Sequence, residues 1–321
     1  MMDSLIGLFG DAQQWLFEAA VQPLMFAAGL GGVLAEGYRA TGWLLVGLVQ
    51  LLVMLTVIHA LERWRPVELL RDRAAVRVDI VYTLIHRLGL FRLLLFFSID
   101  PLWDALVGAL RLQGVQGFAL DALAPGLSDH ALVSFIIYLV VFDFVDYWLH
   151  RAQHQVGWWW QLHALHHSQR QMTMWSDNRN HLLDDVLRDS VFVLLALGLG
   201  VPPAQFVALV ALTQLLESLA HANVRLSFGP LLGRVLVSPR FHRLHHSIGT
   251  GHESHGPGSL GGHNFAVLFP LWDMLFGTAR FDDAYEPTGI RDQLPEQGAR
   301  DYGRGFFAQQ WLGVMRLFGR A

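Results

Sequence analysis

Histidine is the residue type in this sequence that is best suited to chemistry. Ten of the 16 histidines fall between positions 150 and 246, most of them in three short blocks. The blocks read H-x-x-x-H, H-x-x-H-H and H-x-x-H-H, and they begin at His150, His163 and His242. Helical residues four apart lie on one face, one turn apart, which is the geometry that two ligands of one metal need. Adjacent histidines are offset by about 100°, so one helix can serve two metals.

The number of clustered histidines predicts two metal ions. A single catalytic zinc takes three protein ligands, and eight imidazoles exceed that requirement. By ligand type alone, iron, zinc, copper and nickel all remain open. We expect iron, because a site that faces C–H bonds in a bilayer implies oxygen activation, which zinc does not perform. The eight expected ligands are His150, His154, His163, His166, His167, His242, His245 and His246.

The composition predicts a membrane protein. Of 321 residues, 53% are hydrophobic and only 16% are charged. The net charge of −4 offers no basic surface for nucleic acid. The absence of cysteine excludes disulfides, Cys-ligated zinc and Cys-ligated iron–sulfur clusters. The first residues carry Asp3 and no basic region, which is not the pattern of a signal peptide.

The apolar segments predict the helices that must position the histidines. Residues 42–60 and 131–149 are long enough to span a bilayer, and 78–99 is a weaker, tilted or partly shielded candidate. Residues 190–219 are apolar but broken by Pro202-Pro203, which predicts a helical hairpin. Residues 5–36 are interrupted by charges and glycines and are expected to lie at the membrane interface.

This order of segments predicts the fold class and the topology. We expect an all-α integral membrane bundle of about three spans plus a helical hairpin, capped by a cytosolic histidine-rich helical region. The arginines that follow the first span, with Trp64, mark the cytoplasmic side, in a bacterial inner membrane. The expected divisions are an interfacial segment (1–41), membrane helices with an external loop (42–130), a catalytic domain (131–280) and a cytosolic tail (281–321).

The blocks and their flanking residues resemble the fatty acid hydroxylase/sterol desaturase superfamily. The flanks are Asp143-Phe-Val-Asp-Tyr-Trp-Leu-His150-Arg before the first block and Leu271-Trp-Asp-Met-Leu-Phe-Gly-Thr278 after the last. The resemblance covers about residues 135–280. It implies a membrane helical scaffold with a cytosolic histidine cluster, and a di-metal centre that uses O2 and external electrons to hydroxylate or desaturate a lipid.

The resemblance implies two more ligands, His181 and His221. His181 stands where the family often has Arg-x-His-Pro-Leu-Glu, although Leu182 and Asp184 replace the proline and the glutamate. His221 follows the hairpin. No catalytic residue is expected beyond the metal ligands. The roles of His252, His255 and His263, in a glycine-rich loop, remain open.

Three residues are expected to hold the ligands in position without binding a metal themselves. Asp146 lies one turn before His150, where its carboxylate could accept the free N–H of that imidazole. Asp143 lies on nearly the same face, and a carboxylate inside a span is costly unless it has a function. The third candidate is Asn223, with Asp184 and Asp273 as weaker ones.

Three functions are compatible with these residues. The first is a lipid hydroxylase or desaturase with two iron ions and O2 as co-substrate, although purified protein could carry zinc. The second is a zinc-dependent hydrolase, which would need a carboxylate base such as Asp184, Asp185 or Glu253. The third is a non-catalytic metal-binding protein. An oxygenase would also need an external electron donor (a reductase, ferredoxin or cytochrome), because the sequence contains no recognisable cofactor loop.

Overall fold

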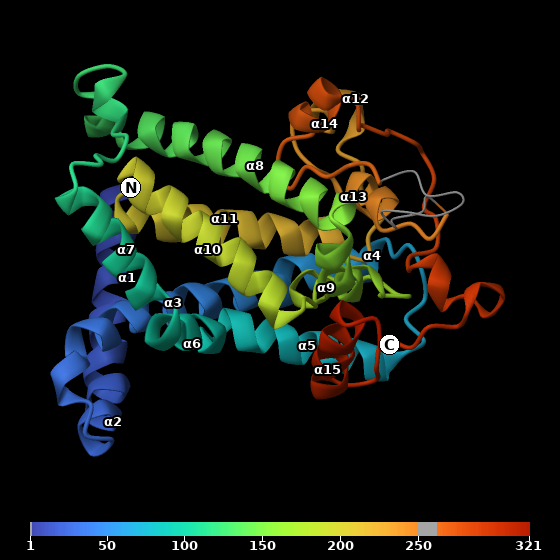
Figure 1. The fold of residues 1–321 in the computed structure, drawn as a ribbon, viewed down its shortest axis with the longest axis horizontal. Helices are drawn as coiled ribbons and strands as arrows, with labels where there is room; N and C mark the ends of the chain where they lie inside the picture. The colour runs from blue at the N-terminus through green and yellow to red at the C-terminus, as the bar shows by residue number, and fades with distance from the viewer. Residues whose placement is uncertain (1, 250–261) are drawn as a thin grey trace.

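The structure is a bundle of long membrane helices with a compact cap at one end. The computed structural model describes residues 2–249 and 262–321. In Figure 1 the helices α3, α5, α8, α10 and α11 run side by side along the long axis, and α9, α13 and α15 gather at the end where the C-terminus lies. Helix α3 packs against α5 and α11, and α11 also packs against α8. The expected all-α membrane bundle is confirmed.

The helices of the described residues divide into the bundle, the cap and the end opposite the cap. The bundle helices are α3 (Leu34–Val53), α5 (Arg73–Arg87), α6 (Leu90–Ser98), α8 (Ala131–Gln155), α10 (Leu182–Leu199) and α11 (Pro203–His221). The cap contains α4 (His59–Trp64), α9 (Gly157–His167), α12 (Gly229–Leu232), α13 (Pro239–His245), α14 (Leu271–Phe276) and α15 (Phe306–Leu317). The opposite end holds α1 (Met2–Leu16), α2 (Gln22–Ala27) and α7 (Asp100–Leu112).

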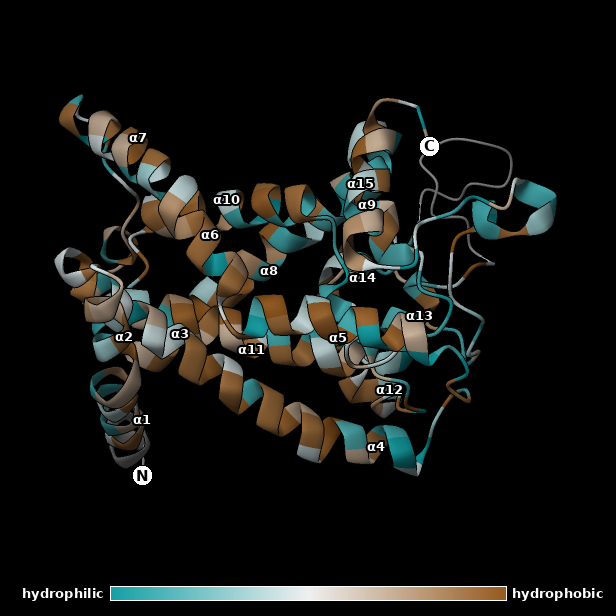
Figure 2. Ribbon diagram, turned by 90° about the horizontal axis from the view of Figure 1, so that it is seen from below, coloured by the Kyte–Doolittle hydropathy of each residue, from teal (hydrophilic) through white to brown (hydrophobic). Residues whose placement is uncertain are grey.

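Three helical segments of the described chain are long and apolar enough to cross a membrane: Gly31–Trp64, Ala131–Gln155 and Pro203–His221. Figure 2 shows the apolar residues along these helices and the polar residues toward the cap. The first segment is longer than the expected 42–60. Its 34 residues correspond to about 51 Å of helix, so it extends well beyond a bilayer core of about 30 Å.

Local sequence explains the two breaks in the bundle. Helices α5 and α6 meet at an angle of 50°, and Gly89 between them has a φ of 76°, which favours glycine. The weaker apolar stretch therefore folds as a bent pair. Helix α10 ends at Gly200 in the left-handed conformation (φ 64°), and α11 begins with Pro203 in its first turn. The helical hairpin expected from the Pro-Pro pair is present.

Gly47 allows α3 to approach the end of α5 closely. A Cβ atom at this position would lie 1.6 Å from the carbonyl oxygen of Arg87. We expect Gly47→Ala to force the two helices apart and to lower the stability of the protein by at least about 1–3 kcal/mol, the usual range for overpacking. Thermal unfolding in detergent would measure the loss. The matched control is Gly108→Ala on α7, where a Cβ would meet nothing within 4 Å. Equal melting temperatures for the two variants would contradict this packing.

Candidate metal centre

The structure gathers eight of the expected histidines into two groups. His150 and His154 from α8, His167 from α9 and His245 from α13 form the first histidine group. The second histidine group consists of His166, His221, His242 and His246. All eight side chains are buried, and within each group four ring nitrogens lie within 4.8 Å of one another.

Helical geometry explains how neighbouring residues serve different groups. His166 and His167 are adjacent on α9, and their rings are turned by 86° relative to each other. One side chain therefore enters each group. Helix α13 divides its histidines in the same way, because His245 joins the first group while His242 and His246, four residues apart, join the second.

The ring nitrogens of the second group converge on one point. Nε2 of His221 lies 3.2 Å from Nε2 of His166 and 2.9 Å from Nε2 of His242, and Nε2 of His246 lies 3.1 Å from Nε2 of His242. Metal–nitrogen bonds of about 2.0–2.1 Å would hold neighbouring ligand nitrogens roughly 2.9–3.4 Å apart. The arrangement therefore fits a metal ion bound at its centre.

Burial keeps these imidazoles in the neutral form that binds metals. The pKa of His166, His242 and His245 is lowered well below the ordinary value of 6.5, mainly because burial removes water from the charged form. Neighbouring histidines lower it further, since two imidazolium ions would repel each other. Neutral imidazole presents a lone pair, whereas imidazolium has none to donate.

Backbone carbonyls orient three of the candidate ligands. Nδ1–H of His150 donates to the carbonyl oxygen of Phe265 (2.8 Å), and Nδ1–H of His245 donates to that of His263 (2.7 Å). Nδ1–H of His221 donates to the carbonyl oxygen of Glu217 (2.8 Å). Each bond fixes the tautomer and leaves the lone pair of Nε2 available for a metal. Sequence reasoning missed these partners because a carbonyl belongs to every residue and leaves no signal in the sequence.

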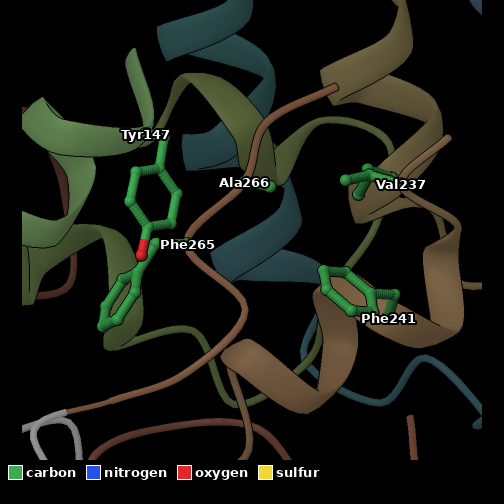
Figure 3. Packing of buried hydrophobic residues seen from close by; sticks show 6 residues of the cluster. Tyr147, Val237, Phe241, Phe265 and Ala266 are labelled. Carbon is green, nitrogen blue, oxygen red and sulfur yellow. The ribbon is translucent and has the colours of Figure 1, made fainter. Parts of the chain in front are cut away.

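Two buried aspartates hold the 263–269 segment, which supplies two of these three carbonyls. Asp273 accepts hydrogen bonds from the backbone N–H groups of Phe265 (2.9 Å) and Ala266 (2.8 Å). Asp143 accepts from the N–H groups of Leu268 (2.8 Å) and Phe269 (3.1 Å). Figure 3 shows the same segment from its apolar side, with Phe265 beside Tyr147 of α8.

The other two supporting residues bond to groups other than the histidines. The carboxylate of Asp146 binds Arg188 (2.9 and 2.5 Å) rather than His150, whose Nδ1 is taken by Phe265. Asn223 accepts from the N–H groups of Val67 and Glu68, both at 3.1 Å. It ties the loop after α4 to the end of α11, two residues beyond the ligand His221.

His163 lies between the two groups and is oriented by Asp184. Its ring centre is 5.2 Å from that of His150 and 5.2 Å from that of His166. Its Nδ1 lies 3.0 Å from Oδ2 of Asp184, and its buried Nε2 has no hydrogen bond among the described residues. Burial alone would raise the pKa of Asp184, but hydrogen bonds from His163, Gln153 and Trp159 lower it. His163 is thus prepared to bind a metal through Nε2.

His181 lies outside both groups. Its Nε2–H donates to the carbonyl oxygen of Gln310 (2.8 Å), and its Nδ1 accepts the N–H of Leu183 (3.2 Å) at the start of α10. A Cβ at Gly313 would meet its ring at 2.2 Å, so glycine is needed there for α15 to pack against it. Both nitrogens are occupied, and this histidine joins α15 to the bundle.

The three loop histidines are only partly described. His252 and His255 lie outside the described residues, as does Glu253. His263 is buried, and burial lowers its pKa to about 4. Its backbone carbonyl accepts the hydrogen bond from Nδ1 of His245, and this contact does not depend on which side chain stands at position 263.

Comparisons with known proteins agree with this geometry. The family model described as fatty acid hydroxylase matches residues 135–278, which include both histidine groups. Through this segment, which is less than half of the chain, the protein is similar to the fatty acid hydroxylase/sterol desaturase superfamily. No solved structure was found to match it.

The relatives that match this segment carry several lipid-related names. It is 30% identical to the ornithine lipid hydroxylase of Rhizobium tropici over 44% of this chain and 40% of that protein. It is 29% identical to the alkylglycerol monooxygenase of Homo sapiens over 42% and 28% of the two chains. A delta(7)-sterol 5(6)-desaturase of Gibberella zeae is 26% identical over 47% of each. The match thus covers less than half of each relative's length.

Two of the candidate bases of a zinc hydrolase, Asp184 and Asp185, are engaged by other side chains. Asp184 accepts from Gln153 (2.7 Å) and Trp159 (2.6 Å) as well as bonding His163. Asp185 lies 3.3 Å from Nε2 of His86. Carboxylates engaged in this way orient other groups and are not held ready to take a proton from water.

Proposed function

We propose that this protein is an O2-dependent di-iron membrane oxidoreductase that hydroxylates or desaturates a C–H bond of a lipid. The observation that carries the proposal is the pair of adjacent, buried groups of four histidines, and we propose His163, which lies between them, as a ninth ligand. We infer that the substrate is a lipid from the names of the relatives, which include a lipid hydroxylase, a monooxygenase and a sterol desaturase.

The overall reaction requires a second substrate and an electron source. Hydroxylation converts R–H, O2, two electrons and two protons into R–OH and water, while desaturation yields an alkene and two waters. Bound iron would supply the oxygen activation. The electrons would come from a separate one-electron carrier such as a reductase, ferredoxin or cytochrome.

The chain's own residues hold and shield the site. Phe265, His263 and Glu217 orient three imidazoles through their carbonyls, and Asp184 orients His163. Burial of every ligand excludes bulk water. Ligands fixed in advance by such partners bind metal more tightly than ligands that must first be ordered.

We further propose that the cap faces the cytoplasm of a bacterial cell across its inner membrane, with residues 131–280 as the catalytic domain. The segment 63–77, at the cap end, carries five arginines and two acidic residues. Arginine-rich loops beside a span are retained on the cytoplasmic side.

Metal analysis tests the proposed function. Protein expressed in iron-supplemented medium should carry about two irons per chain and should consume O2 when it is given lipid extract, a ferredoxin and its reductase. Mass spectrometry of the lipids should then show a gain of 16 daltons or a loss of 2. Stoichiometric zinc in protein from the same iron-supplemented medium, combined with lipid hydrolysis and no O2 consumption, would establish the hydrolase instead.

A further inference from the structure

A cavity inside the bundle leads toward the metal centre. It has a volume of about 140 Å³ and lies between α3, α5, α8, α10 and α11. A smaller cavity of about 40 Å³ lies against the histidines. The two are back to back, because they share six lining residues: Asp146, Asp177, Asn180, Asp185, Arg188 and Glu217. The two cavities therefore adjoin at these residues, and we refer to them together as the path.

The lining of this path changes from polar to apolar with distance from the metal centre. On α11, Glu217 lies four residues before the ligand His221, Leu209 twelve and Phe206 fifteen. At a rise of 1.5 Å per residue, these positions are about 6, 18 and 22 Å away. On α8, Asp146 and Phe142 stand about 6 and 12 Å before His150 in the same order. The polar end therefore adjoins the metal centre.

Carboxylates outnumber cations at the polar end. Arg188 lies between Asp146 (2.5 Å) and Glu217 (3.0 Å), so two carboxylates share one guanidinium. Asp185, which is 9% exposed, has the imidazole of His86 as its ion-pair partner at 3.3 Å among the described residues. Buried carboxylates are costly unless a positive group compensates them. This end of the path favours a ligand that carries a cation.

The end of the cavity away from the metal centre is lined by phenylalanine rings that pack against one another. The rings of Phe142 and Phe192 stack with their centres 5.7 Å apart, and Phe206 packs against Phe142 at 6.1 Å. Gly89, Arg92 and Trp43 also line this cavity. The guanidinium of Arg92 lies 5.7 Å from the centre of the Trp43 ring. A chain end placed at the opposite, polar end would instead cover ion pairs with hydrocarbon, which removes water without replacing its hydrogen bonds.

We propose that the path binds an amine-bearing polar lipid with its head toward the metal centre, the ammonium group against Glu217 and Asp185 and the chain among Phe142, Phe192 and Phe206. This inference rests on the proposed function, and it defines the substrate class. The oxidised C–H bond then lies in or beside the polar head, and not within an acyl chain or a sterol ring.

Photolabelling tests this orientation without turnover. Two dodecylamine probes, one with a diazirine beside the amine and one with it at the chain end, are applied to the full-length protein with its metals in phosphatidylcholine nanodiscs. The amine-side diazirine should label residues 184–188 and 146–150, and the chain-end diazirine residues 206–210 and 142. The reverse pattern, or no label in the cavity, would overturn the proposal.

Charge selectivity is tested by one variant and one matched probe. Glu217→Gln should reduce amine-side labelling about tenfold, as expected for the loss of a hydrogen bond to a charged group. Glu18→Gln, at an exposed position on the π-helical turn Phe17–Val21, should leave it unchanged. A diazirine-bearing dodecanoate should label far more weakly than the amine. Equal labelling by the amine and carboxylate probes would contradict the proposal. Lower metal content in Glu217→Gln with unchanged labelling would also contradict it, because the carboxylates would then support only the metals.

The two proposals fail separately. Labelling needs neither O2 nor electrons, so protein that labels as expected but consumes no O2 would refute the oxygenase and keep the site. Protein that oxidises lipid but labels in the reverse orientation would refute the head-first site alone.

Discussion

Replacing His245 or His242 by alanine should leave about one metal per chain and abolish lipid oxidation. Each residue belongs to a different four-histidine group, so each variant removes one ligand from one metal. Activity should fall by at least about a hundredfold, because even the loss of a ligand's hydrogen-bond partner costs 10–100-fold. Elemental analysis and oxygen uptake on the same preparation measure both effects.

The matched control is His130→Ala. His130 is exposed and precedes the first turn of α8, far along that helix from His150. It should retain both metals and full activity. Full turnover with two bound metals in either His242→Ala or His245→Ala would remove that histidine from the ligand set.

Asp273→Ala should destabilise the metal centre without touching a ligand. The substitution leaves the N–H groups of Phe265 and Ala266 buried without an acceptor, at a cost of about 1–3 kcal/mol each. Because the carbonyl of Phe265 orients His150, metal affinity should also fall about 10–100-fold. Chelator titration followed by absorbance or elemental analysis measures the affinity, and thermal unfolding measures the stability.

Two further variants separate this effect from general damage. Asp273→Asn keeps one acceptor oxygen and should lie between the wild type and Asp273→Ala in both measurements. Asp11→Ala, at an exposed position on α1, should match the wild type. If Asp273→Ala lowered the melting temperature while metal affinity stayed normal, the 263–269 segment would have no part in orienting the ligands.

The parts of the fold that depend on local signals could be predicted from the sequence. Unbroken apolar runs indicated the spans, and Pro202-Pro203 indicated the hairpin. The first helical segment is longer than expected mainly at its start, because Glu36 and Arg39 interrupt the apolar pattern of residues 31–41, and it also continues past Glu62 and Arg63 to Trp64. The carboxylate of Glu62 accepts hydrogen bonds from Met174 and Asn223, contacts that no local pattern reveals.

The site shows the same division between local and long-range information. Histidine spacing on α9 and α13 indicated which faces the side chains share. It did not reveal that Asp146 would bind Arg188, 42 residues later, or that Gln310 of α15 would occupy Nε2 of His181. These partners come from separate elements, and only their packing in three dimensions brings them together.

The spread of the ligands along the chain has a consequence for biogenesis. The first group combines His150, His154 and His167 with the late-arriving His245, and the second depends on His221, His242 and His246. A chain emerging from the ribosome therefore cannot complete either group until α10 and α11 have been made and inserted, since domains fold in the order of synthesis. Metal binding would then be the last step of folding. Cells short of metal would accumulate protein that is inserted in the membrane but incompletely folded.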